Sequence, residues 1–125
     1  MREARVRAYR RGVLAETFAA LLLRLKGDRI VARRYKTPVG ESGLVALKGR
    51  RLAFVEVKRR RTAEDAAWTL PAKQRRRIVR AAQYWRSAHP SFNGHDISFD
   101  VVLTSRLAWP RLYRERISRL THDAV

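Results

Sequence analysis

The first segment with regular hydrophobic spacing is "GVLAETFAALLLRLKGD", residues 12–28. Its large apolar residues recur at i, i+4, i+7, i+8 and i+11, and they are Leu14, Phe18, Leu21, Leu22 and Leu25. This spacing is typical of the apolar stripe of an amphipathic helix. Because glycine commonly ends helices, we predict a helix that stops at Gly27 and turns this stripe toward the core.

Short runs of β-branched and alternating residues follow. The strands predicted from them are "RIVARRYK" (29–36), "GLVALK" (43–48), "RLAFVEVK" (51–58) and "DISFDVVLTS" (96–105). The breaker "TPVGESG" separates the first two, and the short turn "KGR" between the second and third fits a hairpin. Three consecutive strands and one later strand are therefore expected.

A second amphipathic pattern lies in "PAKQRRRIVRAAQYWRSAH", where Ile78, Ala82 and Trp85 share one face and Pro71 stands in the first turn. We also predict a terminal helix in "WPRLYRERISRL", with Tyr113, Ile117 and Leu120 on one face. Residues 59–70 lack periodicity and indicate a mobile loop, and residues 1–10 a basic N-terminal arm. The order α-β-β-β-α-β plus a C-terminal helix predicts an α/β fold with a mixed β-sheet and flanking helices.

The length of 125 residues suits a single domain, 1–125, and the charge narrows its function. Lys and Arg number 29 against 11 Asp and Glu, a net charge of +18, which favours a polyanionic partner and above all nucleic acid. An anionic membrane surface, a ribosome and a merely soluble basic protein stay open as alternatives. The chain has no cysteine and a charged N-terminus, so we expect a cytoplasmic protein with no membrane segment, in which carboxylates, imidazoles or carbonyls would hold any metal.

The stretch "FVEVKRRR" raises the question of an active site. Residues i and i+2 of a strand point to the same face, so Glu56 and Lys58 are predicted to be neighbours where an apolar surface ends. A carboxylate in a buried strand is costly unless it is paired or binds a cation. The alternative is an exposed strand end with a weak Glu–Lys surface pair.

The order of these motifs resembles the PD-(D/E)XK nuclease superfamily and, more narrowly, the YraN family of small bacterial proteins. The matching features run from about Gly12 to Ala124: Gly12, Glu16 and Ala19 or Ala20 on the first helix, then "GESGLV", "FVEVKRR", Lys73, "FDVV" and "ISRLTHDAV". The resemblance implies a restriction-endonuclease-like three-layer fold similar to that of Holliday-junction resolvases. It also implies a site that binds Mg²⁺ and a nucleic-acid phosphate.

By this resemblance, Glu56 and the Val57 carbonyl would bind Mg²⁺, Lys58 would stabilise charge at the phosphate, and Glu16 would complete the catalytic set. The sequence departs from the family where the pattern Gly-Glu-Ile-Asp becomes Gly40, Glu41, Ser42, Gly43. Glycine therefore replaces the metal-binding aspartate, and Glu41 is the candidate substitute. Glu16 has Ala19, Ala20 and Leu23 as helical neighbours, so its face is expected to be covered, although a solvent-facing acid is the simpler alternative.

Two basic runs are expected to converge beside this strand. The candidate nucleic-acid-binding residues are Arg59, Arg60, Arg61, Lys73, Arg76, Arg77 and Arg80. A solvated helix face is the alternative for either run alone. Trp68 and Tyr84 are candidates for base stacking, although core packing is the commoner role, and Trp85 and Trp109 are assigned to packing.

Three functions follow from different classes. We favour a nucleic-acid-binding protein of nuclease-like fold whose catalytic site is degenerate, because Gly43 supplies no carboxylate. The alternatives are an active Mg²⁺-dependent endonuclease on branched or damaged DNA, and a basic interaction module on a ribosome or another polyanion. DNA is favoured over RNA, and a homodimer is expected only from the likeness to resolvases.

Overall fold

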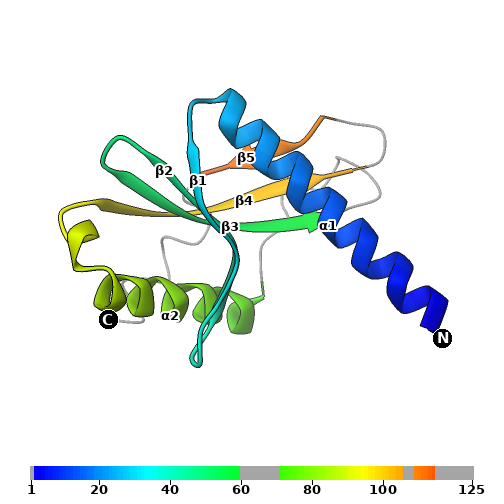
Figure 1. Ribbon diagram of the computed structural model, residues 1–125, viewed down its shortest axis with the longest axis horizontal. Coiled ribbons are helices and arrows are strands. Elements are labelled where there is room, and N and C mark those ends of the chain that lie inside the picture. The colour runs from blue at the N-terminus through cyan, green and yellow to red at the C-terminus, as the bar shows by residue number, and fades with distance from the viewer. Residues whose placement is uncertain (1, 60–70, 106–108, 115–125) are drawn as a thin grey trace.

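The computed structural model describes residues 2–59, 71–105 and 109–114 (Figure 1). Its elements in chain order are α1 (Arg2–Leu25), β1 (Arg29–Lys36), β2 (Glu41–Lys48), β3 (Arg51–Arg59), α2 (Ala72–Ala88), a 3₁₀ turn (Pro90–Phe92), β4 (Asp96–Thr104) and β5 (Arg111–Tyr113). The predicted order α-β-β-β-α-β is confirmed, and β5 adds a strand that the sequence did not indicate.

The five strands form one mixed sheet in the order β1-β2-β3-β4-β5. Strands β3 and β4 are parallel, and the other neighbouring pairs are antiparallel. The predicted hairpin between β2 and β3 is confirmed, and Gly49 in its turn has a φ of 58°, which glycine adopts without steric cost. Because a parallel pair needs a long crossover, α2 lies in the connection between β3 and β4.

Helices cover both faces of this sheet and make three layers, as Figure 1 shows. One core cluster joins Ile78, Val79 and Trp85 of α2 to Val45 and Phe54 of the sheet. A second cluster lies between α1 and the opposite face, and its members include Ala19, Ala20, Leu23, Leu44, Ala46, Ala53, Val55 and Val102. The predicted apolar face of α2 is therefore confirmed, because Ile78, Ala82 and Trp85 are all buried.

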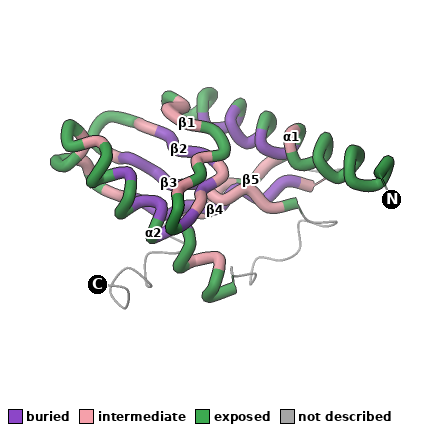
Figure 2. Tube along the Cα trace, turned by 60° about the horizontal axis from the view of Figure 1, so that its bottom comes forward, coloured by how far each residue is buried: buried purple, intermediate pink, exposed green. Residues whose placement is uncertain are grey.

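The predicted stripe on the first helix was wrong for four of its five residues. Leu14, Phe18, Leu21 and Leu25 are exposed, whereas the buried face of α1 carries Ala15, Glu16, Ala19, Ala20, Leu22 and Leu23. Small alanine side chains let the helix backbone approach the sheet closely, and this close packing decides the buried face. Figure 2 shows the consequence, since purple appears only on the C-terminal half of α1. The N-terminal half, which includes the predicted arm, is an exposed helix from Arg2 onward.

The C-terminal prediction also needs correction where the structure describes it. Residues Arg111–Tyr113 form a strand and not the start of a helix, because Tyr113 pairs with Val101 at the free edge of β4. Arg114 then fixes this end, with its Nη1 donating to Oδ2 of the fully buried Asp100 at 3.0 Å. The prediction that Trp109 packs in the core is wrong, because this residue is 64% exposed. Ile117 and Leu120 of the predicted helix, and residues 60–70 of the predicted loop, lie outside the described residues.

Membrane insertion finds no support in the described helices. Neither α1 nor α2 combines the length and the apolar character that a bilayer span requires.

Candidate functional site

The end of β3 presents an acid and an ammonium group side by side. Glu56 and Lys58 follow the buried Phe54 on the face that α2 covers, and Lys58 Nζ lies 3.6 Å from Glu56 Oε1. Their side chains are about equally accessible, with 23% of Lys58 and 21% of Glu56 exposed. The predicted i, i+2 pair is therefore present, and it is an ion pair that is partly removed from solvent.

Burial leaves Glu56 short of compensating charge. Desolvation raises the pKa of its carboxyl above the ordinary value, and the negative charge of Glu41 acts in the same direction. Lys58 and Arg77 lower the pKa, but burial is the largest effect and the net direction is upward. A carboxylate in this condition gains stability from a proton or from an added cation.

Gly43 lies on β2, the strand next to the one that carries Glu56. Leu44 pairs with Val55, so continuing the antiparallel register by one residue places Gly43 opposite Glu56. A Cβ atom built on Gly43 would lie 3.1 Å from the Val55 carbonyl oxygen and 3.6 Å from the Val57 nitrogen. Position 43 therefore lies beside the segment of β3 that carries Glu56, and glycine supplies no side chain there.

Glu41 is positioned by a tight approach between the β1–β2 turn and α2. A Cβ on Gly40 would lie 2.0 Å from the Arg77 carbonyl oxygen, so only glycine allows this contact. The Thr37 hydroxyl closes the same turn by accepting from the Gly40 N–H at 2.9 Å. Glu41 Oε1 consequently lies 3.1 Å from Arg77 Nη2, and its charge reaches Glu56.

These groups fit Mg²⁺ incompletely. The ion takes six oxygen ligands in near-octahedral geometry, usually with one or two carboxylates among them. The described chain offers Glu56, the Val57 carbonyl and Glu41, but Glu41 is engaged by Arg77 and Glu56 by Lys58. Within residues 2–59, 71–105 and 109–114, no group of three or more acidic or imidazole side chains gathers as a metal site would require. Both carboxylates near this end of β3 therefore already have a cationic partner.

The outer face of α2 carries the predicted cations. Lys73, Arg76, Arg77 and Arg80 are exposed, while Ile78 and Ala82 on the other side are buried. Tyr84 lies one turn beyond Arg80 and is 41% exposed, which leaves its ring accessible for stacking. Arg59 ends β3 and is exposed. Arg60, Arg61 and Trp68 fall outside the described residues, so their predicted roles are not tested.

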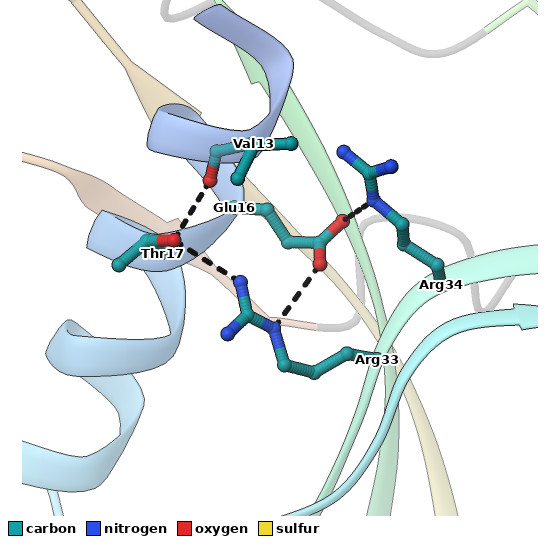
Figure 3. Close-up of polar contacts among 5 residues, drawn as sticks. All are labelled: Val13, Glu16, Thr17, Arg33 and Arg34. Carbon is teal, nitrogen blue, oxygen red and sulfur yellow. Dashed lines mark hydrogen bonds and ion pairs between the residues drawn. The ribbon is translucent and has the colours of Figure 1, made fainter. Parts of the chain in front are cut away.

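Glu16 is in a different neighbourhood from Glu56. It is 8% exposed, in line with the prediction of a covered face. Its Oε1 lies 3.2 Å from Arg33 Nε and its Oε2 lies 3.3 Å from Arg34 Nε, as Figure 3 shows. The structure therefore joins Glu16 to β1 on the α1 side, and it joins Glu41, Glu56, Lys58 and Arg77 on the α2 side.

Sequence reasoning missed Arg33 and Arg34. Successive strand residues point to opposite faces, so the strand pattern gave no reason to place both side chains on one carboxylate. Arg34 departs from that pattern because its φ is 51°. The only sequence signal was the Arg-Arg pair itself within the predicted strand 29–36.

The sequence of this chain is similar to those of known bacterial proteins. The model of the uncharacterised protein family UPF0102 matches residues 15–104. A UPF0102 protein of Parvibaculum lavamentivorans is 54% identical over 104 residues, which cover 83% of this chain and 78% of that protein. A UPF0102 protein of Rhodopseudomonas palustris (strain BisB18) is 49% identical over 107 residues, covering 86% and 79%.

A solved structure matches the fold. Hjc of Archaeoglobus fulgidus, a Holliday junction resolvase from an archaeal hyperthermophile, superposes with a TM-score of 0.56 at 20% sequence identity. The match covers 85% of this chain and 77% of that chain. At 20% sequence identity this likeness shows a shared fold alone.

Proposed function

Since the chain belongs to the UPF0102 family, also known as the YraN family, and has a resolvase-like nuclease fold, we propose that it binds nucleic acid, DNA in preference to RNA, with an incomplete catalytic site. The binding surface would comprise the basic face of α2, with Lys73, Arg76, Arg77 and Arg80, and the end of β3. This binding surface would be extended along the nucleic-acid backbone by Arg59, Arg60 and Arg61.

The observation that carries the proposal is the glycine opposite Glu56. A nuclease of this type needs two carboxylates on neighbouring strands to hold Mg²⁺ against a phosphate. Here Glu56 and Lys58 stand in place on β3, while β2 offers Gly43 at the matching register. An exposed basic helix face beside a site with only one carboxylate on β3 supports binding without efficient cleavage.

The active nuclease is the second candidate, and Glu41 is the observation that favours it. This carboxylate is close enough to Glu56 to raise its pKa, so the two acids share one electrostatic environment. For Glu41 to bind Mg²⁺ it would have to release Arg77, a contact between two side chains that are each nearly half exposed. Exchange of such a surface ion pair costs little, about 0–1 kcal/mol.

DNA binding measured against salt concentration tests the proposal. On a short labelled duplex, contacts to four to six phosphates give a slope of log K against log salt of roughly −4 to −5. The variant Lys73→Gln/Arg76→Gln/Arg80→Gln should reduce the steepness of this slope by up to about 3. Under Mg²⁺ the wild type should leave linear and four-way branched duplexes intact.

The control replaces two exposed arginines elsewhere, Arg24→Gln/Arg29→Gln, and it should leave the slope almost unchanged. A slope near zero for the wild type would overturn nucleic-acid binding. Cleavage of the branched duplex that disappears in Glu56→Gln would instead establish the active nuclease.

The wider predictions made from the sequence are part of the same proposal. A single domain over residues 1–125, a cytoplasmic location and a homodimer like that of resolvases each stay predictions.

A further inference from the structure

We infer that Arg33 and Arg34, positioned by the buried Glu16, form a second phosphate-binding site for the nucleic-acid backbone on the α1 side of the sheet. The inference rests on the proposed function and adds a surface that the α2 residues do not include. Glu16 acts here as a positioning residue, and the two guanidinium groups are the binding groups.

The contacts of the cluster occupy only some of the guanidinium donors (Figure 3). Each oxygen of the Glu16 carboxylate accepts from the Nε of one arginine. Arg33 Nη2 also donates to the Thr17 hydroxyl at 3.1 Å, and that hydroxyl donates to the Val13 carbonyl at 2.8 Å. A guanidinium has five N–H donors, so these contacts use the Nε edge and leave terminal nitrogens for a ligand. The side chains of Arg33 and Arg34 are 41% and 38% exposed, so a ligand in solution can reach this pair.

The backbone at Arg34 is held in an uncommon conformation. Its φ of 51° is in the left-handed region, the only such value at a non-glycine residue in the described part of the chain. This turn lets Arg33 and Arg34 both reach Glu16, while Tyr35 packs on Trp85 of α2 with ring centroids 5.0 Å apart. A non-glycine residue in this region is strained, and such strain is concentrated at functional sites.

The charge of the cluster favours an anion. Two guanidiniums against one carboxylate leave one net positive charge, and the carboxylate is the buried member. Arg34 Cζ also lies 4.8 Å from the centroid of the Tyr9 ring, which links the cluster to the exposed half of α1. That half carries Arg2, Arg5, Arg7, Arg10 and Arg11 against Glu3 alone. A linear polyanion such as a nucleic-acid backbone matches a charged surface that continues along a helix.

The test removes the whole cluster without stranding a buried charge. The variant Glu16→Gln/Arg33→Gln/Arg34→Gln should retain its fold, judged by circular dichroism, because the acid leaves together with its partners. On the same labelled duplex, loss of two phosphate contacts should reduce the steepness of the salt slope by about 1.8, at about 0.9 per phosphate. Arg24→Gln/Arg29→Gln removes two exposed arginines from the same two elements and lowers the net charge more, so it is the matched control.

A second variant preserves the charge. Arg33→Lys/Arg34→Lys keeps the positive charges beside Glu16 but removes the planar forks, so DNA affinity should fall several-fold at constant net charge. The site would be overturned if the folded triple variant kept the wild-type salt slope. It would also be overturned if the control lost as much of the slope as the triple variant, or if the lysine variant kept the wild-type DNA affinity. If the α2 variant still shows its loss, the proposed function stands; if the wild type does not bind DNA, the proposed function fails first.

Discussion

Two glutamates on opposite sides of the sheet face different electrostatic conditions. Glu16 on the α1 side is 8% exposed and contacts two guanidiniums, one at each carboxylate oxygen. Glu56 on the α2 side has one ammonium at 3.6 Å and the negative charge of Glu41 nearby, and burial raises its pKa. The charge of Glu16 is balanced by its two arginine partners, whose side chains it holds in position. The charge of Glu56 would be stabilised by an added cation or proton. The two acids therefore differ in how far the protein itself balances their charge.

The largest change is expected from Glu16→Gln. Loss of the buried carboxylate leaves Arg33 and Arg34 without their shared partner, although partial exposure lets water solvate them. Breaking a fully buried pair costs about 3–5 kcal/mol, and discounting for this exposure gives about 1–2 kcal/mol of lost stability. Urea denaturation at constant m-value measures it. An unchanged midpoint would show that the two ion pairs contribute nothing.

Gly43→Asp sharpens the other half of the comparison by adding a carboxylate opposite Glu56. Mn²⁺ affinity, measured by titration calorimetry, should rise at least about tenfold, which is about 1.4 kcal/mol. The φ of Gly43 is outside the left-handed region, and its new Cβ needs the Val55 carbonyl to shift by only a few tenths of an ångström. Gly43→Asp/Glu56→Gln is the control and should lose the gain. Tight Mn²⁺ binding by the wild type that depends on Glu56 would show that Glu41 already supplies the second ligand.

The smallest effect is expected from Glu56→Gln at neutral pH. Because the folded-state pKa of Glu56 is raised, the folded protein holds this proton more tightly than the unfolded chain does. The associated stability is present below the ordinary carboxyl pKa and is lost as pH rises through the raised value. Wild type should therefore lose stability relative to Glu56→Gln over this interval, and the variant should be more stable at neutral pH by less than about 1 kcal/mol. A pH-independent difference between the two denaturation curves would contradict the upward shift.

The sequence predicted the parts of this protein in which one local rule decides the structure. Alternation along β3 predicted the Glu56–Lys58 pair, and the 3.6-residue period predicted the buried Ile78–Trp85 face of α2. The same period failed on α1, because it gives weight to large side chains such as Phe18 and Leu21, whereas the sheet accepts the alanine face. Here close packing against a particular partner decides the contact, and sequence spacing carries no information about that partner.

The other misses have a similar origin. Tyr113 lies in a pattern with helical spacing, yet the free edge of β4 recruits it into a strand. Arg33 and Arg34 share Glu16 because Arg34 takes a left-handed conformation. Glycine and asparagine are the residues that usually signal this conformation in a sequence, and neither is next to Arg34. Both features follow from tertiary contacts that override the local preference.

The order of strands in the sheet determines which step of folding costs the most chain entropy. Strands β1, β2 and β3 follow one another through short turns, and β5 also neighbours the strand that precedes it in sequence. Among the described strands, only the ladder from Arg51↔Asp96 to Arg59↔Thr104 joins strands across a long connection, which contains the whole of α2. Closure entropy grows with the length of the connection, so its greatest single cost lies in this ladder. Glu56 belongs to it, opposite Val101, and the surroundings of that acid are complete only when the longest loop of the sheet has closed.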